Sequence, residues 1–205
     1  MPYFNIVAET SENTVVTEYE PVKKRSDSYQ SEAALEQEFI RLLCEQGYEY
    51  LPIHTEKDLI ANLRKKLEEL NNYQFSDTEW DDFFKNAVAN PNEHIVEKTR
   101  KIQEDNVQVL TRDDGSSKNI TLIDKKNIHN NRLQVINQYV IGTENGAKHD
   151  NRYDVTVLVN GLPLVHIELK RRGVAIREAF NQINRYQRDS FWAGCGSVSY
   201  THLRA

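Results

Sequence analysis

Apolar residues in the first half of the chain recur with the period of an α-helix. Over residues 58–70 a leucine appears at every third or fourth position, with charged residues between. The same spacing over 28–46 predicts an earlier helix, which Asp27 or Ser28 caps and Gly47 ends. The apolar stripe of this first helix comprises Leu35, Phe39, Leu42 and Leu43.

Two further helices are predicted downstream. Ser76 and Glu79 form a capping-box pattern before several large apolar residues, and Pro91 breaks the helix that follows. Another helix covers 93–103, so that residues from about 56 to 103 form a helical insertion between the first helix and the sheet. The aromatic residues of this insertion are expected in its core and not on a base-stacking surface: Trp80, Phe83 and Phe84.

Runs rich in β-branched residues predict the strands. Residues 107–111 and 120–124 flank a turn and form a hairpin, and 133–140 forms another strand. Near the start, Val15, Val16 and Thr17 indicate a short strand or an arm. The fold class is therefore α/β, with a mixed central sheet of about four or five strands flanked by helices. The sheet is expected to join the strands near 107–140 to a hairpin over 154–170, with helices over 28–46 and 175–188 packed alongside.

The hairpin around Asn160-Gly161 contains the candidate chemistry, and its register decides which residues face each other. A two-residue loop sets Asp154 opposite Ile167, whereas a three-residue loop sets it opposite Glu168. Pro163 cannot donate to a strand ladder and disturbs the tight register. A site that uses both acids therefore requires an odd-length loop or a bulge.

Asp154, Glu168 and Lys170 suit phosphodiester hydrolysis. Glu168 and Lys170 share a face of their strand because they are two residues apart. The two carboxylates are hard oxygen ligands for Mg²⁺, which can polarise a phosphoryl oxygen and activate a water. Lys170 can orient that water or neutralise the charge that develops on the phosphorane. The alternative interpretation is a solvated strand end.

The chain resembles the PD-(D/E)xK nuclease superfamily and, more closely, the amino-terminal endonuclease domain of type I restriction enzyme R subunits. The resemblance covers most of residues 27–186 and implies a restriction-endonuclease-like fold. It also implies that a helical glutamate, for which Glu36 is the candidate, lies near the metal; an exposed helix acid is the alternative. The matching motifs are Asn151-Arg152-Tyr153-Asp154, Asn160-Gly161-Leu162-Pro163, Glu168-Leu169-Lys170, residues 173–179 and the QxxxY-like element from Gln182 to Tyr186. A tyrosine, not a proline, precedes the acid.

The resemblance also implies the partners. These are double-stranded DNA and the methyltransferase and specificity subunits of a type I complex, with ATP used only by a motor domain outside this chain. The residues expected to bind or position DNA are Gln182, Tyr186, Arg171, Arg172, Arg177 and Arg185. A stand-alone resolvase or repair-type nuclease, and a catalytically silent DNA-binding or docking module of the same fold, remain the alternatives.

Composition narrows the class of protein. The formal net charge of −5 excludes a generally basic DNA-coating protein but leaves room for a local basic patch. Cys44 and Cys195 provide neither a disulfide framework nor metal-ligand spacing. The sequence shows no signal peptide and no membrane span, so a cytoplasmic location is the default.

The end of the chain departs from the expected pattern. Residues 197–205 lack the apolar strand that should follow the QxxxY helix. We therefore expect a nuclease domain over 1–196, truncated at its end, followed by a non-native tail over 197–205; a natural short tail is the alternative.

Overall fold

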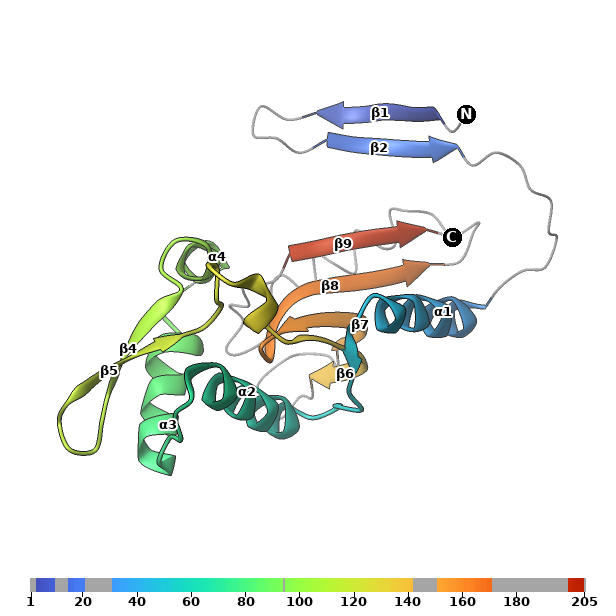
Figure 1. Ribbon diagram of the computed structural model, residues 1–205. Coiled ribbons are helices and arrows are strands. Elements are labelled where there is room, and N and C mark those ends of the chain that lie inside the picture. The colour runs from blue at the N-terminus through green and yellow to red at the C-terminus, as the bar shows by residue number, and fades with distance from the viewer. Residues whose placement is uncertain are drawn as a thin grey trace. The chain divides into compact units, whose positions relative to one another are not determined.

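The computed structural model describes residues 3–9, 15–20, 31–93, 95–141, 151–170 and 199–204. It divides into two units, residues 1–30 and 31–205. The first unit is an antiparallel hairpin of β1 (Tyr3–Glu9) and β2 (Val15–Glu20) (Figure 1). The strand predicted around residue 16 is confirmed, and β1 is its partner.

A mixed five-stranded sheet organises the second unit. Its order is β3-β6-β7-β8-β9, with antiparallel neighbours in the middle and a parallel neighbour at each edge (Figure 1). This confirms the predicted α/β class with a mixed sheet. The five strands are β3 (Glu49–Tyr50), β6 (Leu133–Ile141), β7 (Asn151–Val159), β8 (Leu162–Lys170) and β9 (Ser199–Arg204).

Helix α1 (Glu32–Glu45) covers one face of this sheet. Its N-cap is Ser31, whose Oγ accepts a hydrogen bond from the Ala34 amide at 3.1 Å, so the predicted caps at Asp27 and Ser28 are wrong. The predicted end at Gly47, which has φ +93°, is confirmed. Leu42 is 40% exposed and does not belong to the packed stripe. The apolar cluster beneath α1 comprises Leu35, Phe39, Ile40, Leu43, Tyr48, Val135, Val155, Val157, Val165, Ile167 and Leu169.

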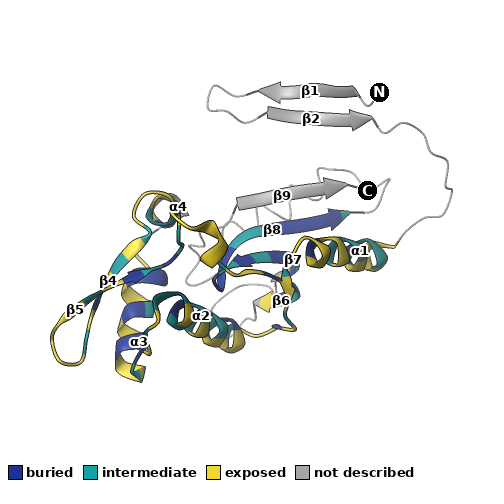
Figure 2. Ribbon diagram, viewed as in Figure 1, coloured by how far each residue is buried: buried dark blue, intermediate teal, exposed yellow. Residues whose placement is uncertain are grey.

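The helical insertion packs on the opposite face of the sheet. Leu59, Leu63 and Leu67 are fully buried against sheet residues that include Ile136 and Leu158. Figure 2 shows the inward sides of α2 and α3 as buried and their outward sides as exposed. Its elements are α2 (Glu56–Asn71), α3 (Asp77–Phe83), the π-helical η1 (Phe84–Val88) and α4 (Ile95–Gln103). The 3-10 turn η2 (Ile128–Asn130) lies later in the chain, before β6.

Two predictions about the insertion are confirmed, and one about the hairpin that follows it is wrong. Ser76 and Glu79 form the capping box of α3, and Trp80 and Phe83 are buried in the insertion's core. The hairpin of β4 (Val107–Thr111) and β5 (Ser117–Thr121), however, forms a separate two-stranded sheet and does not join the main one. Its apolar face packs against the insertion's core instead, through Leu110 and Ile120.

The last strand was not expected from the sequence. Residues 199–204 pair in parallel with β8, so the prediction that the tail holds no strand is wrong. The physical reason is that the outer edge of β8 presents unpaired backbone groups, which any extended segment can satisfy whatever its side chains. The division of the chain at residue 196 stays a prediction.

Candidate active site

The turn between β7 and β8 holds the hairpin against the insertion. Asn160 and Gly161 have φ values of +52° and +82°, as a two-residue hairpin turn requires. A Cβ at Gly161 would lie 2.6 Å from the Leu63 Cα, so only glycine allows α2 to pack this closely. The Asn160 side chain donates to the Leu122 carbonyl at 3.0 Å and accepts from the Arg132 amide at 2.8 Å.

A bulge in β8 corrects the register that this turn would otherwise impose. Leu158 pairs with Pro163, but Val157 pairs with Val165, so Leu164 is the extra residue. The pairing then continues to Val155 and Ile167, the last pair of this ladder. The next residues on the two strands are Asp154 and Glu168, so this register brings them to matching positions. The expected requirement for an odd-length loop or a bulge is met by the bulge.

Asp154, Glu168 and Lys170 are brought together by this register. The Asp154 carboxylate accepts a hydrogen bond from the Leu169 amide at 2.9 Å. Lys170 Nζ lies 2.5 Å from Glu168 Oε1 and forms an ion pair with it. Glu168 is only 4% exposed, so this carboxylate is removed from water, with Lys170 as its ion-pair partner among the described residues.

The electrostatics of the two acids differ from those of surface carboxylates. Burial raises the pKa of Glu168 to about 7; the Asp154 charge raises it as well, and the hydrogen bond from Lys170 opposes them. Burial also raises the pKa of Asp154, against the hydrogen bond from Leu169, and the charge of Glu36 adds to the rise. Each acid therefore favours a nearby positive charge.

Lys170 responds in the opposite sense. Burial disfavours its charged form, but its hydrogen bond to Glu168 and the nearby carboxylates outweigh burial and raise its pKa. Lys170 is thus a stable cation at neutral pH.

Glu36 lies on the α1 side of this group and is 8% exposed. Its two carboxylate oxygens accept hydrogen bonds from Asn137 Nδ2 at 2.6 Å and Gln138 Nε2 at 2.5 Å. Neither amide was identified from the sequence. The available signal was an adjacent pair of polar side chains inside a mainly apolar strand, because buried polar groups need partners.

Two carboxylates opposed across neighbouring strands fit a divalent cation chemically. Both are hard oxygen donors, and both have a pKa raised by burial and by like charges, which a bound cation would offset. Among the described residues, no group of three or more His, Cys, Asp and Glu side chains is arranged to hold a metal ion. Asp154 and Glu168 remain the candidate cation-binding pair, with Glu36 as a further candidate.

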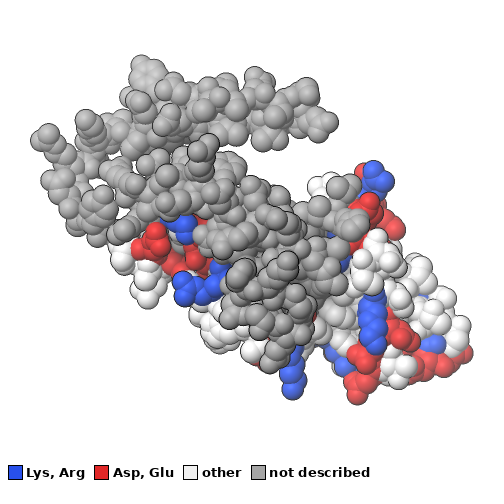
Figure 3. Space-filling model, turned by 180° about the vertical axis from the view of Figure 1, so that it is seen from behind, with Lys and Arg blue, Asp and Glu red and all other residues white. Residues whose placement is uncertain are grey.

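The expected DNA-binding residues cannot be compared with the structure. All six lie outside the described residues: Gln182, Tyr186, Arg171, Arg172, Arg177 and Arg185. On the face shown in Figure 3, the described basic and acidic side chains lie beside each other and form no broad patch of one sign.

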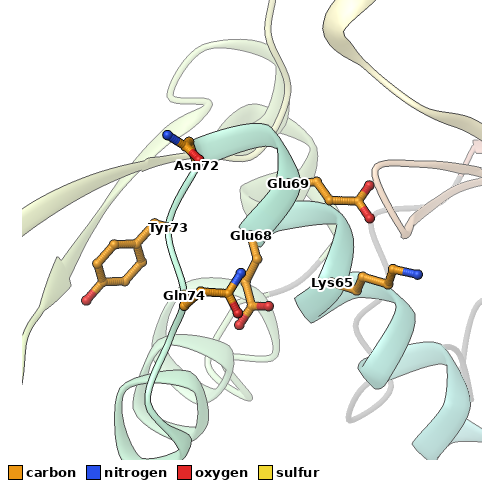
Figure 4. Close-up of a pocket in the computed structure, with 6 residues that line it drawn as sticks. All are labelled: Lys65, Glu68, Glu69, Asn72, Tyr73 and Gln74. Carbon is orange, nitrogen blue, oxygen red and sulfur yellow. The ribbon is translucent and has the colours of Figure 1, made fainter.

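A separate hollow of about 420 Å³ lies at the end of α2 (Figure 4). It shares no residue with the candidate active site. Charges of both signs line it, and Glu68 within it already accepts hydrogen bonds from Arg64 and the Phe75 amide. Its lining comprises Lys65, Glu68, Glu69, Asn72, Tyr73 and Gln74.

The mixed α/β fold is that of a restriction-endonuclease-like N-terminal domain. Residues 29–202 match the family model described as type I restriction enzyme R protein N terminus. The chain belongs to this family. None of the helices in the part of the chain that the structure describes combines the length and hydrophobicity needed to cross a bilayer.

Curated relatives carry consistent names. The chain is 50% identical over 198 residues to the type I restriction enzyme EcoprrI endonuclease subunit of Escherichia coli, covering 96% of this chain and 62% of that protein. It is 39% identical to the SsaAORF53P endonuclease subunit of Staphylococcus saprophyticus and 31% identical to the HindI endonuclease subunit of Haemophilus influenzae. Those two matches cover 80% and 77% of this chain but only 17% of each relative, so the chain spans a part of the relatives' length.

Proposed function

We propose that this chain is the Mg²⁺-dependent DNA endonuclease domain of the R subunit of a type I restriction-modification complex. The observation that carries the proposal is the bulge at Leu164, which sets Asp154 opposite Glu168 with Lys170 beside them. Relatives named as type I restriction enzyme endonuclease subunits support the same activity.

The proposed mechanism gives each residue one role. Asp154 and Glu168 hold the cation; when bound, Mg²⁺ supplies Lewis acidity for the phosphoryl group and the attacking water. Lys170 keeps its charge at neutral pH, so its ammonium group can stabilise the negative charge that develops on the phosphorane. The buried setting strengthens this electrostatic effect because little water screens it.

The proposed function also requires DNA and other subunits. Double-stranded DNA is the substrate, and methyltransferase and specificity subunits are the partners, with ATP used by a motor domain outside this chain. Because the proposed substrate is DNA, the proposed location of this activity is the cytoplasm. Gln182, Tyr186 and the arginines at 171, 172, 177 and 185 would contact DNA phosphates, and their roles stay predictions.

The test is plasmid cleavage by the complete complex assembled with this domain. We expect cleavage in Mg²⁺, none in excess chelator, and none with Asp154→Ala, while the Asp154→Ala complex still forms and binds DNA. Cleavage that persists with Asp154→Ala at the wild-type rate would overturn the proposal. Asp81→Ala, an exposed acid on α3, is the matched control and should cleave normally.

A further inference from the structure

The segment that joins β5 to β6 contains a loop, residues 124–132, whose backbone is held by its own side chains (Figure 1). One oxygen of the Asp124 carboxylate accepts from the amides of Lys126 and Asn127, at 3.0 and 2.9 Å. The other oxygen accepts from Asn130 Nδ2 at 2.7 Å. The hydrogen bond from the Asn127 amide is the largest cause of a lowered pKa at Asp124, so this charge is stabilised within the loop.

Asn131 connects the loop to the turn between β7 and β8. Its Nδ2 donates to the carbonyls of Asp124 and Ile128, at 2.8 and 3.0 Å. Its Oδ1 accepts from the Asp124 amide at 2.9 Å and from Asn160 Nδ2 at 2.8 Å. Asn160 also exchanges two hydrogen bonds with the backbone of Arg132. The loop backbone is therefore fixed to the sheet, and the side chains that it exposes are preorganised for a ligand.

The exposed side chains of this loop carry positive charge. They include Lys126, Ile128, His129 and Arg132. Asp124 is the only acid among residues 124–132. Of the ion pairs between described residues, none includes Lys126 or Arg132. At 68%, Ile128 is the most exposed large apolar side chain in the described part of the chain. The loop thus presents two cations beside an apolar group.

The end of α4 lies beside the start of the loop. Lys125 Nζ donates to the Gln103 carbonyl at 2.8 Å. The two acids that follow have partners of their own. Glu104 pairs with an arginine of α4 at 3.6 Å, and the Asp105 carboxylate accepts from a glutamine of β4 at 3.3 Å. This segment therefore engages Lys125 and forms no ion pair with the other cations of the loop.

We propose that the 124–132 loop is a DNA-backbone binding site separate from the candidate active site. Lys126 and Arg132 each bind a phosphate, His129 donates a hydrogen bond to a phosphate oxygen, and Ile128 packs against a deoxyribose. Phosphates and sugars alternate along a DNA strand, so cations beside an apolar side chain match its chemistry. This inference rests on the proposed function, which makes double-stranded DNA the ligand.

Strand β7 fixes the distance between the loop and the candidate active site. Six residues separate Asp154 from Asn160, which spans about 20 Å at about 3.3 Å per residue. Along B-DNA, at about 3.4 Å per base pair, this distance corresponds to about six base pairs. The loop therefore holds the duplex about half a helical turn from the bond that is cut.

Binding of a fluorescent DNA duplex to the 205-residue chain, followed by anisotropy from about 20 to about 200 mM salt, tests this site. Lys126→Ala/Arg132→Ala should lower the affinity at least about tenfold and reduce the slope of log K against log salt by about two. Ile128→Ala should lower the affinity about two- to fivefold and leave the slope unchanged, because it removes no charge. The matched control, Lys57→Ala/Lys85→Ala, removes the same charge from exposed positions of α2 and η1 and should change neither quantity.

The substituted side chains are exposed, so the melting temperatures should be unchanged. Equal losses of affinity in the loop and control variants would show a general effect of net charge and overturn the inference. A wild-type chain that binds no duplex at about 20 mM salt would overturn it as well. So would loop variants that bind DNA normally but no longer assemble with the other subunits, because the loop would then contact protein.

Asp154→Ala separates this inference from the proposed function. If Asp154→Ala abolishes cleavage while the loop variants bind DNA like the wild type, only this inference fails. If the Asp154→Ala complex cleaves normally while the loop variants lose DNA affinity, the proposed function fails and the loop remains a DNA contact.

Discussion

The insertion and the sheet each bury a glutamate, Glu79 and Glu168 respectively. The two regions differ in how well they stabilise the charged form of that side chain. The exposed fractions of Glu79 and Glu168 are 6% and 4%. Burial acts to raise the pKa of Glu79, but hydrogen bonds from the Ser76 amide, the Tyr73 hydroxyl and the Asp113 amide outweigh burial, and its pKa is lowered. Burial raises the pKa of Glu168 to about 7; among the described residues Lys170 opposes this rise, and the charge of Asp154 adds to it.

The difference lies in the number and origin of the donors. The Glu79 partners come from its own capping box and from neighbouring loops, so the charge is part of the hydrogen bonding that folds the insertion. Glu168 has acids nearby on β7 and α1 and one lysine, so ionising it costs the folded chain stability. A buried carboxylate whose negative charge has few hydrogen-bond donors or cations around it can be stabilised further by a bound cation.

The largest expected contrast is in cleavage. In the assembled complex, Glu168→Ala should lower the cleavage rate more than about 100-fold, because a cation ligand is lost. Glu79→Ala, assayed well below its melting temperature, should stay within about threefold of the wild type because it touches no reacting group. The measurement is the initial rate of plasmid cleavage at saturating Mg²⁺. Equal losses of cleavage rate in Glu168→Ala and Glu79→Ala would contradict the assignment of Glu168, and not Glu79, to the active site.

A second prediction separates the lysine from the acids it accompanies. Lys170→Ala should keep Mn²⁺ affinity within about threefold but lower the cleavage rate by about 10²–10³-fold, because the charge acts on the developing phosphorane. Calorimetry beside cleavage measures both quantities. Lys66→Ala, which removes a lysine paired with Glu69 on α2, is the control and should leave both unchanged. Loss of cation binding in Lys170→Ala would contradict the division of roles.

For the free energy of unfolding, unlike the cleavage rate, Glu79 should matter more than Glu168. Glu79→Ala leaves two backbone amides and the Tyr73 hydroxyl without their acceptor, so the free energy of unfolding should fall by about 2–3 kcal/mol. Urea denaturation of the metal-free chain measures this loss. Asp81→Ala, on the exposed side of the same helix, should change it by less than about 0.5 kcal/mol. A Glu79→Ala chain as stable as the wild type would show that these hydrogen bonds do not hold the insertion.

The smallest expected effect is the pH dependence of the metal-free chain. Because the folded pKa of Glu168 exceeds its ordinary value of 4.5, the folded chain binds more protons than the unfolded chain between pH 4.5 and about 7. Stability from this group is therefore greatest at low pH and is lost as the pH rises through about 7. Glu168→Gln should be more stable than the wild type by about 1–2 kcal/mol at pH 8, with the difference shrinking toward pH 4.5.

His166 makes folding stability depend on pH in the opposite direction, so its contribution must be separated from that of Glu168. Burial lowers the pKa of His166 to about 3, so its stability contribution is present above the ordinary value of 6.5 and is lost as the pH falls toward 3. Both chains contain His166, so the difference between the wild type and Glu168→Gln in urea denaturation, measured in chelator at pH 4.5, 6, 7 and 8, isolates the Glu168 slope. A wild-type slope that Glu168→Gln leaves unchanged in this window would contradict the assignment.

The sequence predicted the elements whose side chains repeat or cap. The leucines of α2 and the Ser76-Glu79 box are local signals, and both appear in the structure. The two-residue strand β3 has no periodicity to detect. The hairpin of β4 and β5 was recognised but placed in the wrong sheet, because its pairing partner depends on packing against the insertion.

The site was predictable to the extent that it depends on short-range chemistry. Asn160-Gly161 predicts the turn, and Pro163 indicates that the tight register is disturbed, but neither specifies a bulge at Leu164. The contacts of Glu36 with Asn137 and Gln138 join residues about a hundred positions apart, so no local pattern reveals them. The raised pKa of Glu168 depends on burial within the folded sheet, so the sequence alone does not reveal it either.

The measurement that tests the central claim most directly is anomalous diffraction from crystals of this chain soaked in Mn²⁺. If Asp154 and Glu168 form one site, a single manganese peak should contact carboxylate oxygens of both residues at about 2.2 Å. The same soak of Glu168→Ala crystals should lose the peak, and Glu79→Ala crystals should keep it. Manganese bound to only one of the two acids, or a peak that survives Glu168→Ala unchanged, would contradict the account.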